Sequence, residues 1–436
     1  MTSPSPSLAH AAALGGVRVL DLTSVVFGPY ASQILADYGA DVIKVEAPGG
    51  DSTRRTGPAQ EPGLAAIFLG LNRNKRSVVL DLKQDAARQA LLALVDQADV
   101  LMHSMRPAKM AALGLDPATL CARNPRLVYA GLYGFGAGGA YDGRPAYDDI
   151  IQGLAGFADL ADRQTGTPRY LPTVAADKTC GLVAAHAILA ALFQRERTGQ
   201  GQQLEVPMFE SMASYVLVEH YYGRHLADTS DGQAGYPRVL TPWRKPCRTA
   251  DGDVCLMPYT DAHWRNLFRA TGHPDLADDP RFADITSRTQ HIAALYELLA
   301  GIVAAHSTAH WLALCERLEI PAAPVNRLQD LENDPHLRSV DFFQPLQSES
   351  GSHYRFTRNP VRLQRSQVPP AMPPRLGEHT RDVLRQAGLD EAGIEALLHS
   401  GAAQQAAPPT RFPQGPRMTS DRNAPAQLGQ ASTGRT

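Results

Sequence analysis

The chain contains few cysteines, and none stands at a spacing that suits a disulfide framework or a metal site. Five cysteines occur in 436 residues, an odd number scattered along the chain without a C-x-x-C pair. The histidines likewise form no H-E-x-x-H motif. This usage is typical of a reducing compartment and argues against a disulfide scaffold or a zinc ribbon. We therefore expect no metal cofactor.

The sequence also lacks an excess of one charge and a long apolar run. Lys and Arg number 42 against 44 Asp and Glu, a formal net charge of −2. A general nucleic-acid surface needs a basic excess, so no nucleic-acid partner is expected. No apolar run approaches ~18 residues, the length that spans a membrane, and Met1–Gly16 lacks the basic start of a signal peptide. We expect a cytoplasmic protein that is not inserted in a membrane.

Several nucleotide-binding and nucleophile motifs are absent as well. The sequence has no Walker A loop, no G-x-S-x-G elbow and no EF-hand loop. Gly134–Gly139 matches G-x-G-x-x-G after an expected strand, but residues 140–145 do not read as a helix start. A dinucleotide site requires the strand, the loop and the helix together. We interpret the segment instead as a loop, either flexible beside a ligand or plain.

Hydrophobic periodicity predicts an α/β fold. Short apolar strands alternate with helical patterns along the first half of the chain, which is the arrangement of a parallel sheet covered by helices. We therefore predict an open, Rossmann-like, doubly wound large domain. The expected strands are 16–22, 41–46, 77–82, 99–103 and 126–130, and the expected helices are 30–38, 86–98 and a long helix just after Asp177.

The composition changes near residue 221, where Gly, Pro and basic residues become dense. We predict a smaller α+β domain over 222–325, so that the large domain comprises 16–221 and a return of the chain over 326–400. The expected elements of the small domain are a strand at 253–257 and helices at 262–270, 288–305 and 308–318. Residues 1–15 and 401–436 contain few large apolar side chains, and we expect both to be disordered.

One aspartate stands where an extended segment meets a long apolar helix. The extended segment reaches Ala175, and helical periodicity begins just after Asp177 and ends at Gly199. Asp is a common N-cap because its carboxylate accepts hydrogen bonds from free N–H groups, and capping is the first interpretation. A carboxylate so placed is expected to stay ionised, and ligands of open α/β sheets gather at such turns. Asp177 is therefore also a candidate nucleophile, with Cys180 interpreted as a small buried neighbour.

A basic run at 73–76 leads into one of the expected strands. A solvated turn is one interpretation of this run. The other is a site for phosphate or adenine, because Arg offers forked hydrogen bonds and Lys a point charge. Further arginines that are candidates for the same anion site are Arg54, Arg55 and Arg106.

A series of short sequence blocks follows a fixed order from about Gly16 to about Gly377. The blocks are Gly28-Pro29, Leu35–Glu46, Asn72–Ser77, Arg106-Pro107 with Leu113-Gly114, Asn124–Val128, Arg197–Gln202, Ala250–Gly252, Ile320–Val325 and Asp334-Pro335. Together they resemble the class III CoA-transferase (CaiB/BaiF) family. This family includes formyl-CoA transferase, carnitine CoA-transferase and, as a branch, α-methylacyl-CoA racemase.

This resemblance implies a homodimer of two interlocked ring-like subunits, with a large Rossmann-like domain built from both ends of the chain and a small domain between. It implies coenzyme A as co-substrate and places the family's catalytic aspartate on Asp177. It implies that a loop with Gly134, Gly136 and Tyr147 lies on the substrate side. The implied contacts to coenzyme A are Val26, Phe27, Asn74, Lys75, Arg76, Ser104, Met105, Arg106, Leu113 and Tyr133.

The activity implied by the resemblance is transfer of CoA from an acyl-CoA to a free carboxylic acid. Asp177 would act as nucleophile, through an aspartyl-acyl anhydride and an aspartyl-CoA thioester. The racemase branch carries a catalytic histidine about thirty residues before its aspartate, where Tyr147 stands here. Because the pKa of tyrosine lies near ~10, transfer is favoured over racemisation. A non-catalytic acyl-CoA-binding protein is the third hypothesis.

Some positions depart from the formyl-CoA transferase pattern. Ala47 and Ala112 stand where that enzyme has cofactor-contacting arginines, so the formyl and oxalate substrate pair is not supported. The sequence does not identify the donor acid or the acceptor acid. We expect the specificity determinants among aromatic residues of the small-domain stretch, which are Tyr221, Tyr222, Tyr236, Trp243 and Tyr259.

Overall fold

The large domain is built on a seven-stranded sheet, in agreement with the predicted α/β fold. In this computed structural model, which describes residues 12–226 and 232–408, the strand order is β12-β3-β2-β1-β4-β5-β6. Neighbouring strands are parallel except β12, which is antiparallel to β3. The order reverses between β1 and β4, as in doubly wound sheets. The strands are β1 (Arg18–Leu22), β2 (Asp41–Glu46), β3 (Lys75–Leu80), β4 (Val100–His103), β5 (Val128–Tyr133), β6 (Gln203–Pro207) and β12 (Ala403–Gln404).

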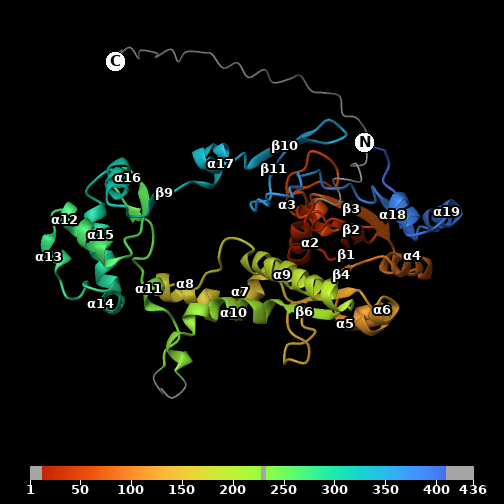
Figure 1. Cartoon of the computed structure of the whole chain (residues 1–436), viewed down its shortest axis with the longest axis horizontal. Helices are drawn as coiled ribbons and strands as arrows, with labels where there is room; N and C mark the ends of the chain where they lie inside the picture. Colours follow the sequence, from red (N-terminus) through yellow and green to blue (C-terminus); the bar gives the residue numbers. More distant parts are fainter. Residues whose placement is uncertain (1–11, 227–231, 409–436) are drawn as a thin grey trace, which may run out of the picture.

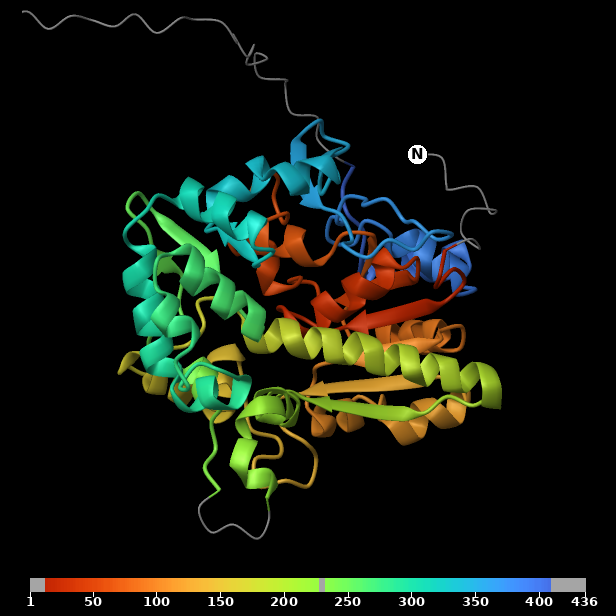
Figure 2. The same cartoon turned by 60° about the vertical axis from the view of Figure 1, so that its left-hand side comes forward.

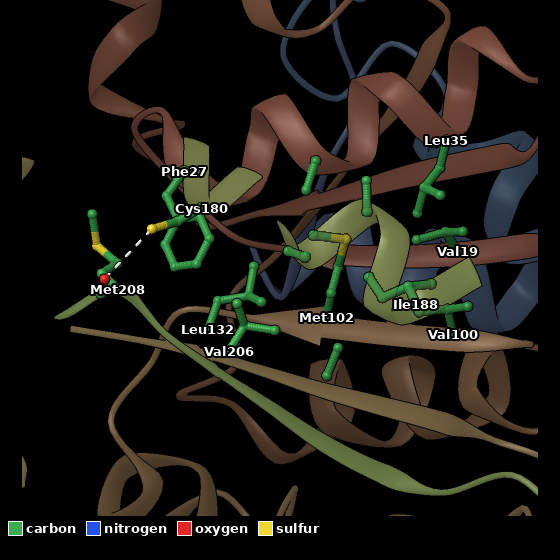
Figure 3. Packing of buried hydrophobic residues seen from close by; sticks show 14 of the residues in the cluster. Val19, Phe27, Leu35, Val100, Met102, Leu132, Cys180, Ile188, Val206 and Met208 are labelled. Atoms are coloured by element: carbon green, nitrogen blue, oxygen red, sulfur yellow. Dashed lines mark hydrogen bonds between the residues drawn. The ribbon is translucent and has the colours of Figure 1, made fainter. Parts of the chain in front are cut away.

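Alternate residues of each strand face opposite layers of helices. Val19 and Val42 pack beneath α2 and α9, whereas Leu20 and Ile43 pack beneath α4 and α19. Because both faces are covered, the strands carry apolar residues on both sides, with buried charged residues such as Asp21, Lys44 and Lys75 among them. Figure 3 shows the first of these two cores. Its helices are α2 (Phe27–Asp37), α7 (Asp148–Leu154), α9 (Ala175–Thr198) and α10 (Met208–His220), and those of the second core are α4 (Asp85–Val95), α5 (Pro107–Ala112), α6 (Pro117–Arg123), α18 (Thr380–Gln386) and α19 (Glu391–His399).

Helix α9 lies along one face of the sheet over 24 residues (Figure 2). It ends at Gly199, whose φ of 76° is left-handed, after a basic last turn, as the sequence predicts. By length and composition alone α9 would suit a membrane span. Its buried side chains, among them Ala184, Ile188 and Leu192, belong instead to the first core of the sheet domain. The apolar character of α9 is that of a core helix.

The smaller domain has a core of its own, formed around Trp264, Phe268, Leu295 and Trp311. Its three strands pair in the order β7-β8-β9, all antiparallel. The single helix predicted over 288–305 is two helices, because His291 has non-helical dihedrals (φ −109°, ψ 23°) between them. The elements are α11 (Pro237–Leu240), β7 (Cys247–Arg248), β8 (Asp253–Leu256), α12 (Asp261–Ala270), α13 (Pro274–Ala277), α14 (Ile285–Gln290), α15 (Ile292–Val303), α16 (Thr308–Arg317) and β9 (Ala322–Pro324).

The chain passes between the two domains twice, as Figure 1 shows. It leaves the large domain after α10 and returns from β9 toward a two-stranded antiparallel sheet of β10 and β11. These two connections give the chain a ring-like course. The remaining elements are α3 (Ala66–Leu71), α8 (Phe157–Thr165), α17 (Pro335–Ser339), β10 (Phe343–Gln347), β11 (His353–Thr357) and the 3₁₀ turns Ser52–Arg55, Tyr222–His225 and Leu328–Asn333.

The end of the described chain completes the large sheet, although disorder is predicted from residue 401. Ala403 and Gln404 pair with Leu80 and Val79 of β3. Ala402 and Ala403 are buried in the second core. Alanines are small enough to fit this edge, and a composition rule that looks for large apolar side chains overlooks them. Disorder was also predicted for 12–15, but Leu14 packs against the first core and its N–H donates to Tyr38 O (2.9 Å). The disorder predicted for 1–11 and 409–436 concerns residues outside the described ranges.

Candidate active site

A cavity of about 280 Å³ opens at the carboxyl ends of the central strands, where the strand order reverses. The turns after β1 and β4 line it together with residues at and after the end of β5. Open α/β sheets bind their ligands at this position. The lining residues are Ser24–Phe27, Ser104, Arg106, Pro107, Leu132–Phe135, Asp142–Tyr147, Asp177 and Met208.

Asp177 reaches the cavity from the first turn of α9. The helix begins at Ala175, before Asp177, and the N-cap residue is Val174. The residues just before it form a bend and not the expected extended segment. The N-cap interpretation of Asp177 is therefore wrong. Among the described residues, no hydrogen bond or ion pair engages the carboxylate of Asp177, whereas its backbone N–H donates to Asp148.

The start of α9 is held by Asp148, which the sequence analysis did not single out. Asp148 Oδ1 accepts a hydrogen bond from the N–H of Asp177 (3.0 Å), and Oδ2 accepts one from Gln152 Nε2 (2.6 Å). Gln152 also fixes the segment before the helix, because its Nε2 donates to Thr173 O and its Oε1 accepts from the N–H of Leu171. Both side chains are buried. This network determines where α9 starts and therefore where Asp177 lies.

Burial and the nearby charge of Asp148 raise the pKa of Asp177 to about 7. Burial is the larger cause, because desolvation disfavours the charged form of a carboxyl group. The expectation that this carboxylate stays ionised is therefore wrong near neutral pH, where both forms are populated. A carboxyl group with a strongly shifted pKa in a cavity is a candidate for chemistry.

Tyr147 and Cys180 lie near Asp177 in opposite environments. Tyr147 precedes α7, lines the cavity and is 71% exposed. Cys180 is fully buried, and its Sγ lies 3.7 Å from Met208 O, as Figure 3 shows. Burial, with a smaller contribution from the charge of Asp177, raises the pKa of the Cys180 thiol to about 12. The thiol is therefore a packing group, and Asp177 is the nucleophile candidate.

The glycine loop borders the cavity and is tied to β6 and α10. Gly134 lines the cavity, but Gly136 does not. The N–H of Gly136 donates to Glu210 Oε1 (2.9 Å), and the N–H of Ala137 donates to Glu205 Oε1 (2.7 Å). The next helix, α7, begins only at Asp148, which agrees with rejecting the dinucleotide motif. The loop is a wall of the cavity, anchored by two carboxylates.

A sequence model described as CoA-transferase family III matches residues 14–380. The chain belongs to this family. Succinyl-CoA:mesaconate CoA-transferase of Haloarcula hispanica is 34% identical, over 86% of this chain and 97% of that protein. Succinate–glutarate CoA-transferase of Agrobacterium fabrum is 33% identical, over 86% and 95% of the two chains.

A solved relative supports the same fold. The crystal structure of Rv3272 from Mycobacterium tuberculosis is 34% identical in sequence and has a TM-score of 0.73. The match covers 85% of this chain and 98% of that one. A protein from Brucella suis described as a CAIB/BAIF family member matches with a TM-score of 0.72 at 31% identity. The family identified from the short sequence blocks is confirmed.

The coenzyme A contacts implied by the family divide between two neighbouring cavities and a third region. A second cavity of about 280 Å³ adjoins the first, and both are lined by Ser24. It also presents Lys83 and Lys109, two cations that the sequence analysis did not select. The implied contacts in the first cavity are Val26, Phe27, Ser104, Arg106 and Tyr133. Those in the second cavity are Met105 and Leu113.

The structure does not bring Asn74, Lys75 and Arg76 to either of these cavities. They lie at the amino end of β3, the edge of the sheet opposite Asp177. Asn74 and Lys75 border a larger cavity of about 650 Å³ there, formed with residues 347–350 and 367–379. That cavity shares no lining residue with the other two.

The cations of the basic run make internal ion pairs. Lys75 Nζ lies 3.3 Å from Asp21 Oδ2, with both side chains fully buried. The guanidinium of Arg73 forks onto Asp37, and that of Arg76 forks onto Asp41. Arg54 likewise pairs with buried Glu46. The run is neither a solvated turn nor a free anion site, because its three cations are already paired with carboxylates of the same domain, of which Asp21 and Asp37 are buried.

Proposed function

We propose that this protein transfers CoA from an acyl-CoA thioester to a free carboxylic acid, with Asp177 as the nucleophile. The observation that carries the proposal is the position of Asp177. A carboxyl group without a partner among the described side chains lines a cavity at the reversal of the strand order. Family membership and the names of the relatives support CoA transfer as the general activity.

The proposed cycle begins with ionised Asp177. Its oxygen attacks the thioester carbonyl carbon, the C–S bond breaks, and CoA thiolate leaves a mixed anhydride behind. The thiolate then attacks the Asp177 carbonyl carbon, which forms an aspartyl-CoA thioester and releases the donor acid. The acceptor carboxylate attacks that thioester, expels the thiolate and forms a second anhydride. The thiolate finally attacks the acceptor acyl carbon, and Asp177 is regenerated as a carboxylate.

Coenzyme A would extend across both adjoining cavities. Its thiol end would lie near Asp177, and its phosphates would meet the cations Lys83, Lys109 and Arg106. Lys supplies a point charge to phosphate and Arg a forked pair of donors. This arrangement assigns the phosphate contacts to residues at the carboxyl ends of the strands, and not to the basic run at the amino end of β3.

We also propose a homodimer, in the interlocked form that the family resemblance implies. Several large apolar side chains of α9 and α10 are exposed, and apolar surface of this kind marks interaction sites. They are Leu182 (53%), Phe193 (63%), Tyr215 (57%) and Val218 (76%). The ring-like course of the chain is compatible with a second copy passing through it. Sedimentation of the full-length protein would measure the assembly directly.

Racemisation of a 2-methylacyl-CoA is less well supported. Moving a proton at the α-carbon needs two acid/base groups on opposite faces of the substrate. Among the described residues, no histidine lines the cavity that contains Asp177. His103 lies behind it, fully buried, with Nε2 3.5 Å from the hydroxyl of Tyr133. Burial lowers the pKa of His103 to about 4, so it is a poor proton acceptor.

The test is to trap the acyl-enzyme. Full-length protein is mixed with an acyl-CoA, quenched with hydroxylamine and digested, and the modified residue is located by mass spectrometry. A hydroxamate at Asp177 is expected. Turnover with Asp177 unmodified would refute the assignment. Deuterium exchange at the α-carbon without acyl exchange would favour the racemase, and CoA binding without either reaction would favour a binding protein.

A further inference from the structure

The cavity at Asp177 contains two arginines whose guanidinium groups have no acidic partner. Arg106 and Arg144 both line it and both are exposed. In the ranges 12–226 and 232–408, neither guanidinium makes an ion pair or a hydrogen bond to a side chain. The acidic residues that line the cavity are Asp142 and Asp177. Asp142 Oδ2 already accepts a hydrogen bond from the N–H of Gly138 (3.0 Å).

The two arginines belong to different walls. Arg106 follows β4 and is flanked by Met105 and Lys109, which line the second cavity. It therefore faces the region assigned above to coenzyme A. Arg144 lies on a different segment of the lining, the one that leads to Tyr147. Because the phosphates of coenzyme A have Lys83, Lys109 and Arg106 on their own side, Arg144 is left for the acid that exchanges CoA.

The position of Arg144 is fixed by an aromatic cluster. Its guanidinium carbon lies 4.7 Å from the centroid of the Tyr141 ring, a cation–π contact. Tyr141 packs in turn against Phe135 and Phe209, with ring centroids 5.3 Å and 6.3 Å away. The N–H of Arg144 donates to Tyr141 O (3.0 Å). A guanidinium held in this way keeps its forked donors free for a carboxylate.

We propose that Arg144 binds a second carboxylate of the acid substrate, so that the acids exchanged by this protein are dicarboxylic. The first carboxylate becomes the acyl group at Asp177, and the second pairs with the Arg144 guanidinium in the same cavity. A monocarboxylic acid leaves that guanidinium without a partner in the cavity. Arg144 is thus a specificity residue for the CoA transfer proposed above, on which this inference rests.

The test compares acids that differ only in the second carboxylate. Wild-type protein, Arg144→Gln and Arg144→Lys are assayed with one acyl-CoA donor and either glutarate or pentanoate as acceptor. Binding of each acid is also measured by calorimetry, without turnover. Arg169→Gln is the matched control, because Arg169 is exposed and does not line the cavity. We expect Arg144→Gln to lower kcat/KM and affinity for glutarate by about 10- to 100-fold and to leave pentanoate within about twofold, with Arg144→Lys intermediate.

Each other outcome is decisive. An equal loss for glutarate and pentanoate, or weaker binding of free coenzyme A, would assign Arg144 to coenzyme A and overturn the proposal. Wild-type preference for pentanoate would overturn it as well. If no acid accepts CoA but glutarate binding still depends on Arg144, the proposed function fails and the carboxylate site stands. If neither transfer nor Arg144-dependent binding is found, both fail.

Discussion

Cations at the two ends of the central strands differ in whether they are paired with carboxylates. At the amino end of β3, Arg73, Lys75 and Arg76 each meet a carboxylate of the same domain. At the carboxyl ends of β4 and β5, Arg106 and Arg144 face a cavity without an acidic partner in the described part of the chain. The sequence makes the first group look like the ligand site, since it is denser in charge.

The comparison shows that charge density along a sequence does not identify a binding site. A buried charge must be paired, because leaving it alone costs several kcal/mol. The cations at the amino end of β3 meet that requirement within the protein and have little left for a ligand. Cations that remain unpaired beside a cavity keep their donors for a substrate. Substitutions at the two ends of the strands should therefore impair different properties of the protein.

Replacing Asp177 should separate chemistry from binding at the cavity. Asp177→Asn removes the nucleophilic oxygen and should lower the transfer rate by roughly 10³-fold or more, while calorimetry should show that coenzyme A still binds. Asp149→Asn is the control, because Asp149 is exposed on α7 and does not line the cavity. If Asp177→Asn retained transfer, the reaction would not take place at this edge of the sheet.

Replacing Lys75 should damage the fold and spare the site. Lys75→Met leaves Asp21 buried without its nearest cation and should lower the free energy of unfolding by about 3 kcal/mol. Denaturant unfolding measures this loss, and the double variant Asp21→Asn/Lys75→Met should recover part of it. The KM for acyl-CoA should not change. A raised KM at full stability would make the basic run a ligand site after all.

Replacing Arg106 should weaken acyl-CoA binding and leave the stability of the fold unchanged. Arg106→Gln removes a cation on the coenzyme A side of the cavity and should raise the KM for acyl-CoA about tenfold, with the melting temperature unchanged. Arg126→Gln serves as the control, since Arg126 is exposed and lines neither of the two adjoining cavities. A fall in stability with an unchanged KM would place Arg106 with the structural cations.

The smallest expected effect is a shift in the pH dependence of kcat/KM. The ionised form of Asp177 is the nucleophile, so kcat/KM should fall as the pH drops through about 7, the raised pKa of that group. Asp148→Asn removes the negative charge that contributes to the raised pKa but keeps an oxygen for the N–H of Asp177. The acid limb of the pH profile should therefore move to lower pH, and a move to higher pH would contradict this electrostatic account. Gln152→Glu adds a negative charge nearby and should move the acid limb to higher pH.

Much of the fold could be predicted because it depends on local periodicity. The apolar strands from Arg18 to Tyr133 lie close to their expected positions, and the basic last turn and Gly199 end α9 as predicted. The break at His291 was not predicted, because an apolar helical pattern continues through it. Strand β12 was missed for a similar reason, since its pairing with β3 joins residues more than 300 positions apart.

The site was predicted less completely, because its geometry depends on contacts between distant segments. Asp177, the candidate nucleophile, lines the cavity, but its N-cap role was wrong because Asp148 holds the helix start from another helix. Arg144 was overlooked because it stands alone in a glycine-rich loop. The small-domain aromatics proposed for specificity line neither of the two adjoining cavities.

The pairing of β12 with β3 has a consequence for how the protein is made. Leu80, on the outer edge strand of the parallel sheet, finds its partner only when Ala403 emerges from the ribosome. At about 5–20 residues per second, the intervening chain takes roughly 15 to 65 s to synthesise. During that time β3 presents unpaired N–H and C=O groups, the kind of edge on which chains aggregate. A nascent chain that stops before the last alanines would therefore depend on chaperones, whatever the strength of the rest of its core.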